Sequence, residues 1–84
     1  MEKVSMYSLS TCPWCRKAKR YFEERGIAYE YTDYDRADEE RKQRIYKDMS
    51  DIGAGGFPVV KIGTNVVVGY KPDRYEELLY PKRI

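Results

Sequence analysis

A pair of cysteines at the junction between a strand-like run and a helix-like run constrains this chain more than any other feature. Residues 4–9 (VSMYSL) are fairly apolar on both alternating faces, which is typical of a central strand. Cys12 and Cys15, the only cysteines, follow directly in the sequence CPWC, and apolar residues then recur at helical spacing over 13–25. We therefore predict a strand over 4–9 and a helix over 13–25, with Thr11 as the N-cap of the helix.

Four further elements follow from local patterns in the rest of the sequence. Residues 27–34 alternate with period two and are rich in aromatic residues, which predicts a second strand. Helix formers over 36–49 predict a mostly solvated second helix, with Asp35 as its cap. Two β-branched runs at 58–62 and 65–69, separated by only two residues, predict a hairpin.

The last predicted element is a short helix that ends near Tyr80. Residues 73–76 (DRYE) fit a capping box with Asp73 in the cap position, directly after Pro72. The element order is then β-α-β-α-β-β-α, which predicts an α/β fold with a four-stranded mixed sheet and three helices. With 84 residues, the whole chain 1–84 is expected to form a single domain.

The spacing of the cysteines favours a redox pair over a structural disulfide. A disulfide within CPWC would close a loop of very few residues and so would stabilise the fold little. The N-terminus of a helix offers unpaired N–H groups and the positive end of the helix dipole, and both favour a thiolate at Cys12. Arg16 and Lys17 add positive charge nearby. We predict that Cys12 attacks a substrate disulfide and that the deeper Cys15 resolves the mixed disulfide.

Two other interpretations of these residues stay open. A structural zinc site needs four ligands, and the chain offers two cysteines and no histidine, so no metal site is expected within one chain. Two chains could together supply four thiolates to zinc or to an iron–sulfur cluster, which makes a dimeric binding module the alternative function. A third hypothesis is a redox-inert adaptor that presents Trp14 and Phe57 to a partner.

Composition argues against two classes of partner. The chain has 16 Lys and Arg against 14 Asp and Glu, and its charge runs mix both signs, so no nucleic-acid partner is expected. No run approaches the roughly 20 apolar residues of a membrane span, and the first residues lack an apolar stretch typical of a signal peptide. We therefore expect a cytoplasmic monomer without a membrane partner, in a compartment that keeps thiols reduced.

Three motifs together resemble a glutaredoxin over nearly the whole chain. They are CPWC after the first strand, Phe57-Pro58-Val59 at the third strand and Gly69 after the fourth. The resemblance implies a thioredoxin-like fold and a cis peptide bond before Pro58 that faces the cysteines. It also implies a thiol-disulfide oxidoreductase that reduces proteins or glutathione mixed disulfides, with the redox-active disulfide Cys12–Cys15 in place of a bound cofactor.

The same resemblance implies a substrate-binding surface around the cysteines. The backbone of Phe57 would pair with an extended substrate chain beside Cys12, and Gly69 would let a backbone approach closely. The expected substrate-binding residues are Thr11, Pro13, Trp14, Phe57, Pro58, Gly69, Tyr70 and Asp73.

The resemblance leaves the electron donor open between glutathione and thioredoxin reductase. Glutathione-binding members carry a basic residue three positions before the first cysteine, where this chain has Leu9, and a basic or polar residue before the proline motif, where it has the glycine-rich stretch 53–56. The sequence GYKPD at 69–73 instead resembles the redoxins that serve ribonucleotide reductase and are recharged by thioredoxin reductase. Lys61 or Lys71 could replace the missing cations, which the two carboxylates of glutathione would need.

Overall fold

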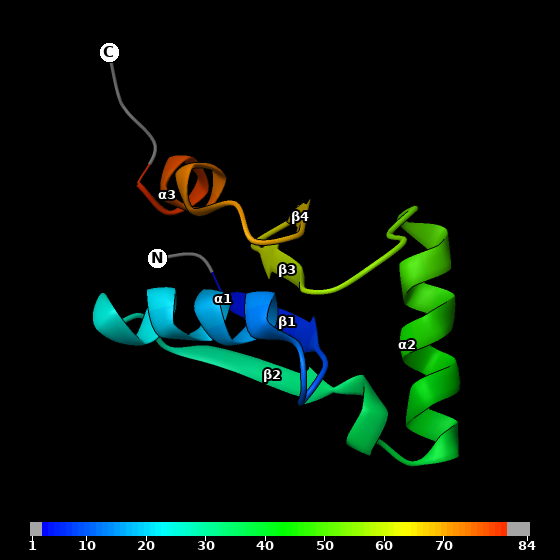
Figure 1. The fold of residues 1–84 in the computed structure, drawn as a ribbon. Coiled ribbons are helices and arrows are strands. Elements are labelled where there is room, and N and C mark those ends of the chain that lie inside the picture. The colour runs from blue at the N-terminus through cyan, green and yellow to red at the C-terminus, as the bar shows by residue number, and fades with distance from the viewer. Residues whose placement is uncertain (1–2, 81–84) are drawn as a thin grey trace.

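The computed structural model describes residues 3–80 as a four-stranded sheet with helices on both of its faces (Figure 1). The elements in chain order are β1 (Val4–Ser8), α1 (Pro13–Glu24), β2 (Tyr29–Asp33), the 3-10 turn η1 (Tyr34–Arg36), α2 (Glu39–Asp51), β3 (Val59–Ile62), β4 (Asn65–Val68) and α3 (Pro72–Leu79). The predicted α/β fold with the order β-α-β-α-β-β-α is confirmed, and η1 is an addition to it. Residues 1–2 and 81–84 of the predicted domain lie outside the described part.

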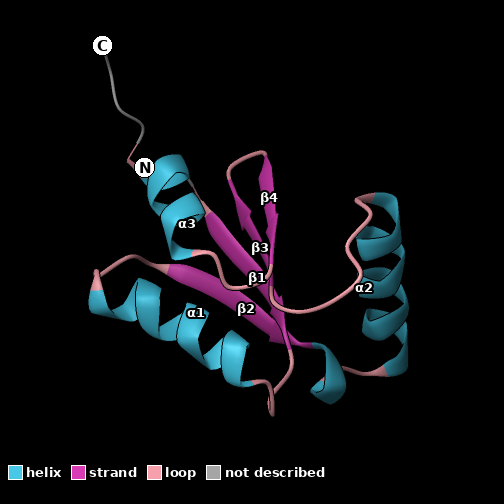
Figure 2. Ribbon diagram, turned by 45° about the horizontal axis from the view of Figure 1, so that its top comes forward, coloured by secondary structure: helices cyan, strands magenta, loops and turns pink. Residues whose placement is uncertain are grey.

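The sheet has the strand order β2-β1-β3-β4 (Figure 2). β1 runs parallel to β2 and places Ser8 opposite Asp33. β1 runs antiparallel to β3, so Tyr7 lies opposite Val59. A parallel pair needs a crossover connection, which α1 provides, whereas β3 and β4 form the predicted hairpin. The end of β1, which leads into α1, and the start of β3, which follows the loop after α2, therefore lie at the same edge of the sheet.

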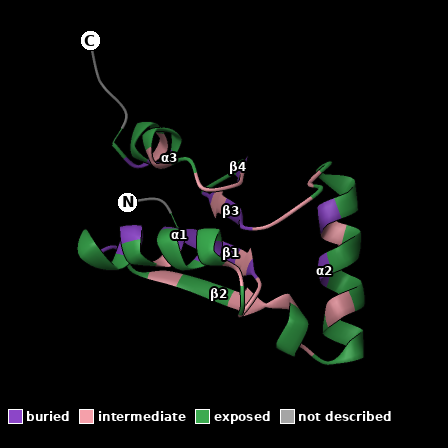
Figure 3. Ribbon diagram, in the orientation of Figure 1, coloured by how far each residue is buried: buried purple, intermediate pink, exposed green. Residues whose placement is uncertain are grey.

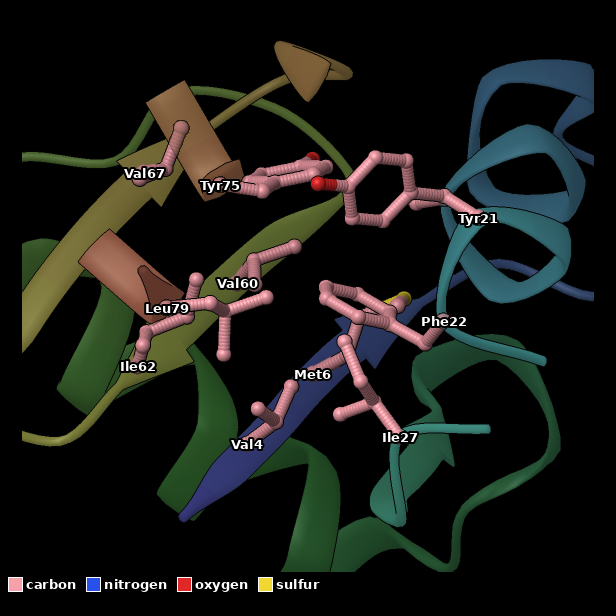
Figure 4. Close-up of a cluster of buried hydrophobic side chains, with 11 residues drawn as sticks. Val4, Met6, Tyr21, Phe22, Ile27, Val60, Ile62, Val67, Tyr75 and Leu79 are labelled. Atoms are coloured by element: carbon pink, nitrogen blue, oxygen red, sulfur yellow. The ribbon is translucent and has the colours of Figure 1, made fainter. Parts of the chain in front are cut away.

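The larger part of the core lies between the sheet and the helices α1 and α3. Alternate residues of the central strands face this side, and Phe22 of α1 and Tyr75 of α3 are fully buried against them (Figure 4). The rings of Phe22 and Tyr75 pack with centroids 5.3 Å apart. The buried residues of this cluster are Val4, Met6, Ala18, Tyr21, Phe22, Ile27, Val60, Ile62, Val67, Tyr75 and Leu79.

On the opposite face of the sheet, α2 packs together with η1 and the loop before β3 around a smaller buried cluster. A narrow stripe of α2 is buried, formed by Ile45 and Met49 against Val59, while most of the helix is exposed (Figure 3). Next to this stripe, Asp48 accepts hydrogen bonds from the Tyr7 hydroxyl and the Lys61 ammonium group. The prediction of a mostly solvated second helix is confirmed. No helix of the described residues combines the length and the apolar character that a membrane span requires.

All three helix caps predicted from the sequence are wrong, each by one to three residues. α1 has Cys12 as its N-cap because Pro13 takes the first helical position, so Thr11 lies outside the helix. α3 likewise has Lys71 as its N-cap before Pro72, which places Asp73 in the first turn.

For α2 the correction shifts the start of the helix. The cap is Asp38, whose carboxylate accepts the N–H of Arg41 at 2.8 Å, and the helix begins at Glu39 instead of residue 36. Asp35 lies in η1, where its carboxylate binds Ser10 and is not available as a cap. Strand ends differ by one or two residues, and β3 begins at Val59 because Pro58 has no N–H for the ladder.

Candidate active site

The two cysteines lie at the start of α1 and differ in exposure. Cys12 is the N-cap, with extended backbone angles of φ −86° and ψ 116°, and its side chain makes no capping hydrogen bond. Its N–H donates to the carbonyl of Leu9 at 3.2 Å. The Cys12 side chain is half-buried, whereas that of Cys15 is 0% exposed, and both residues are free thiols. A substrate can therefore reach the Cys12 sulfur, while Cys15 sits one turn inward.

Burial separates the chemistry of the two thiols. It raises the pKa of Cys15 to about 12, an effect that the backbone N–H of Leu9 opposes and the neighbouring Cys12 reinforces. Lys19 lowers the pKa of Cys15 by a smaller amount. Cys15 is consequently a neutral thiol at neutral pH. Cys12 differs in position, because it is the N-cap residue directly before the first turn of α1.

The loop that carries Cys12 is held in place by polar contacts with the end of β2 and with η1. The N–H of Ser10 donates to the carboxylate of Asp35 at 2.9 Å, and the Ser10 hydroxyl donates to the same carboxylate. These bonds lower the pKa of Asp35. Two residues before Ser10, the fully buried Ser8 donates a hydrogen bond of 2.6 Å from its hydroxyl to the carboxylate of Asp33. The position of Cys12 relative to the sheet is thus set by two Ser–Asp pairs.

Pro58 and Gly69 meet at the end of the sheet beside this loop. The Phe57–Pro58 peptide bond is cis, and the Pro58 carbonyl accepts a hydrogen bond of 2.7 Å from the N–H of Gly69. The β1–β3 register pairs Tyr7 with Val59. The β1–β3 ladder ends with this pair, so Phe57 and Pro58 directly precede β3 at the edge of the sheet where β1 leads into the Cys12 loop.

An aromatic pair of one exposed and one partly buried ring lies beside the cysteines. Trp14, which is 55% exposed, stacks on Tyr70 with ring centroids 6.2 Å apart and an interplanar angle of 28°. The Lys17 ammonium group lies 4.5 Å from the centre of the Trp14 ring, one helical turn further on. The aromatic pair therefore joins the start of α1 to the segment after β4, two parts of the predicted substrate-binding surface.

Gly69 is held by a buried residue of α3 that the sequence analysis did not assign to the site. The fully buried Tyr75 donates from its hydroxyl to the carbonyl of Gly69 at 2.5 Å. Gly69 has φ +97°, a conformation that favours glycine. Tyr75 and the Ser10–Asp35 pair are the residues of the site that the sequence did not point to, and no local pattern links them to their partners.

The lysines predicted as replacement anchors for glutathione have different surroundings. Lys61 forms an ion pair with Asp48 and lies 3.4 Å from the Tyr7 hydroxyl, on the α2 face of the sheet. Lys71 is exposed, and its Cε lies 4.0 Å from the position that a Cβ on Gly69 would take. Of the two, only Lys71 lies next to the segment around Pro58.

A hollow of about 510 Å³ borders the site on the side of α2. It lies between the end of α2 and the glycine-rich loop before β3. Phe57 forms part of its wall and packs on Tyr34, with ring centroids 5.7 Å apart. None of its lining side chains is charged. They are Tyr34, Tyr46, Met49, Ser50, Ala54, Gly55, Gly56 and Phe57.

Two predicted substrate-binding residues lie apart from these contacts. Thr11 is exposed on the loop before Cys12. Asp73 is exposed in the first turn of α3, and its carboxylate forms no ion pair within residues 3–80. The same part of the chain contains no cluster of three or more His, Cys, Asp or Glu side chains that could hold a metal ion.

Comparison with known proteins gives one family. The family model described as Glutaredoxin matches residues 4–67. A relative from Clostridium pasteurianum, an "uncharacterized glutaredoxin-like 8.6 kDa protein in rubredoxin operon", is 30% identical over 76 residues, which cover 90% of this chain and 96% of the relative.

Solved structures agree with this match. The glutaredoxin from Archaeoglobus fulgidus superposes with a TM-score of 0.82 at 37% identity, covering 95% of this chain and 88% of that one. The NrdH-redoxin from Escherichia coli, described as a glutaredoxin-like protein with a thioredoxin-like activity profile, gives a TM-score of 0.79 at 26% identity, with 96% and 99% of the two chains covered.

Proposed function

This chain belongs to the glutaredoxin family, a family of thiol-disulfide redox proteins, and on that basis we propose that it reduces disulfide bonds in proteins through a dithiol cycle at Cys12 and Cys15. The observation that carries the proposal is the difference between the two sulfurs. Cys12 reaches the surface at the N-terminus of α1, whereas Cys15 is wholly buried one turn further on. Cys12 can react directly with a substrate disulfide, whereas Cys15 can react only with the mixed disulfide that forms at Cys12.

The first step is attack by Cys12. Its thiolate forms a bond to one sulfur of the substrate disulfide, and the other substrate sulfur leaves as a thiolate that takes a proton from solvent. The N–H groups in the first turn of α1 favour the attacking thiolate. The product is a mixed disulfide between Cys12 and the substrate.

The second step is resolution by Cys15. The Cys15 thiol loses its proton and attacks the sulfur of Cys12, which forms the Cys12–Cys15 disulfide and releases the second substrate sulfur as a thiol. The protein has then given two electrons to the substrate and needs an external dithiol to recover them. A cytoplasmic location would supply such a reductant.

We further propose that the substrate is an extended polypeptide segment that lies along Phe57 and Pro58. The antiparallel pairing of β1 and β3, which ends at Tyr7 and Val59, supports this proposal, because a strand added along Phe57 and Pro58 would bring a substrate cysteine toward the Cys12 loop. Trp14, Tyr70 and Gly69 border the same place from the other side. Thr11, Pro13 and Asp73 stay at the rim of this proposed surface.

We propose that proteins are better substrates than free glutathione. Leu9 and the glycine-rich loop supply no cation, and Lys61 is paired with Asp48, which leaves Lys71 as the one remaining candidate anchor for the two carboxylates of glutathione. The similarity to a redoxin with a thioredoxin-like activity profile supports a thioredoxin-reductase type of electron donor. A metal- or cluster-binding dimer has less support, because a shared site would have to draw on Cys15, whose side chain is 0% exposed.

The experiment measures NADPH consumption with a model protein disulfide. Electrons are supplied through glutathione and glutathione reductase in one reaction and through thioredoxin reductase in another, with Cys12→Ser as the control. We expect turnover with thioredoxin reductase and none with the Cys12→Ser variant. Wild-type protein no faster than Cys12→Ser with both donors would refute the proposed function, and turnover with glutathione alone would refute the proposed donor.

A further inference from the structure

Two exposed lysines lie near the Trp14–Tyr70 pair beside Cys12. The ammonium group of Lys17 lies over the ring of Trp14 at 4.5 Å from its centre. Lys71 directly follows Tyr70, and its side chain passes close to Gly69, whose N–H is bonded to the Pro58 carbonyl. A substrate that covers Trp14 and Pro58 would therefore lie near two cations.

The positive charge continues along α1. Arg16, Lys17 and Arg20 are exposed positions of α1 at helical spacing, between the buried residues that face the sheet. Residues 3–22 contain five lysines and arginines and no acidic residue. The exposed charges at the start of α1 are thus positive, although Asp35 and Asp73 add two exposed carboxylates around the site and the net charge of the whole chain is only +2.

These cations are not neutralised by the described part of the chain. Within residues 3–80, no carboxylate forms an ion pair with Arg16, Lys17, Arg20 or Lys71. Two neighbouring cations do have partners: Lys19 forms an ion pair with Asp33, and Arg74 forms one with Glu77. Unpaired exposed cations around a reactive group attract a partner of opposite charge and speed its encounter.

We propose that the surface formed by Trp14, Tyr70, Lys17 and Lys71, extended by Arg16 and Arg20, selects disulfides that lie in acidic protein segments. The apolar part of the segment covers the aromatic pair, and carboxylates near the substrate cysteine lie against the lysines. This inference rests on the proposed function and narrows its substrate class.

The test compares three peptides that share one internal disulfide and differ only in their flanking residues, which are Glu, Gln or Lys. For each peptide, kcat/KM is measured with thioredoxin reductase or a chemical dithiol as the electron source, at low and at high salt. We expect the order Glu, Gln, Lys, with the advantage of Glu over Gln reduced at high salt because ions screen exposed charges.

Variants then locate the charges that matter. The double variant Lys17→Gln/Lys71→Gln should lower the Glu-to-Gln ratio of kcat/KM by about fivefold, the size expected for exposed charge pairs. The matched control, Arg41→Gln/Lys47→Gln, removes the same charge from exposed positions of α2 on the opposite face and should keep the wild-type ratio. Both values in the Glu-to-Gln ratio of kcat/KM are measured on the same variant. A change in the folding of that variant or in the reactivity of Cys12 therefore affects both values and cancels in the ratio.

The outcomes separate this inference from the function it rests on. Equal rates with all three peptides, or an equal loss of the ratio in the α2 control, would overturn the acidic preference and leave disulfide reduction intact. A further probe is a peptide that carries glutathione in a mixed disulfide. If the double variant lowers kcat/KM for this probe as much as for the Glu peptide, the acidic preference is overturned, because the lysines then bind glutathione. Failure to reduce any peptide would count against the proposed function itself.

Discussion

The side chain of Cys15 is completely buried although it lies only three residues after Cys12, whose side chain reaches the surface. The difference arises because Cys12 caps α1 while Cys15 lies on the helix face that packs on the sheet. Burial keeps Cys15 protonated, with a pKa raised to about 12. The positions of the two cysteines therefore assign attack to Cys12 and resolution to Cys15 in the proposed cycle.

Replacement of the buried thiol should stop the cycle after its first step. We expect Cys15→Ser to form a stable mixed disulfide between Cys12 and a substrate peptide, visible by intact mass spectrometry. Its turnover should fall on the order of a hundredfold, because an intramolecular thiol must be replaced by one from solution. The Cys12→Ser variant is the control, and a mixed disulfide formed by that variant would contradict the assigned roles.

The raised pKa of Cys15 predicts how resolution depends on pH. Below its pKa the thiolate fraction of Cys15 grows with pH, so resolution of a preformed mixed disulfide should speed up about tenfold per unit between about pH 6 and about pH 9. Rapid quenching and mass spectrometry can follow this step. Iodoacetamide should modify one cysteine in the native protein and both in denaturant. A resolution rate independent of pH would show that loss of the Cys15 proton does not limit it.

The contact between Asp48 and its two partners should stabilise the docking of α2. Asp48→Asn should lower the free energy of unfolding by about 1–2 kcal/mol at pH 7, because Lys61 and Tyr7 lose a partly buried carboxylate. Urea denaturation measures this change. Glu40→Gln, which breaks an exposed pair with Arg44, is the control and should change stability by less than about 0.5 kcal/mol.

The same carboxylate predicts an acid dependence of stability. The ammonium group of Lys61 and the hydroxyl of Tyr7 hold the pKa of Asp48 below its ordinary value. Its contribution should therefore be complete above about pH 4, the value of an unfolded aspartate, and disappear as the pH falls through the lower folded value. The difference in stability between wild type and Asp48→Asn should shrink in acid, and a difference that stays constant to pH 2 would argue against this ion pair.

Gly69 should tolerate a side chain poorly. Its φ of +97° is unfavourable for residues with a Cβ, so Gly69→Ala should cost about 1–2 kcal/mol in the free energy of unfolding. Gly55→Ala is the matched control, because Gly55 has no positive φ and an added Cβ would meet nothing within 4 Å. Equal stability of the two variants in thermal denaturation would show that the conformation of Gly69 is not required.

The helix caps show where local sequence patterns are insufficient. Asp35 and Asp38 are both chemically suitable caps for α2, and the sequence does not show that Asp35 is occupied by Ser10 from another part of the chain. Thr11 and Asp73 were favoured as caps by residue type, but a proline at the first helical position moved each cap to the residue before it. In each case a competing contact or a backbone restriction decided among similar local choices.

The sequence by itself determined the order of strands and helices, the position of the cysteine pair at a helix start and the burial of Cys15. These properties follow from residue type and from periods of two or 3.6 residues, which act within a few neighbouring positions. Only the tertiary structure decided that Gly69 is bonded to Pro58, that Trp14 stacks on Tyr70 and that Lys61 is paired with Asp48, while Lys71 has no ion pair among residues 3–80. Those contacts join residues far apart in the chain, and they depend on the strand order and register of the sheet, which no local pattern contains.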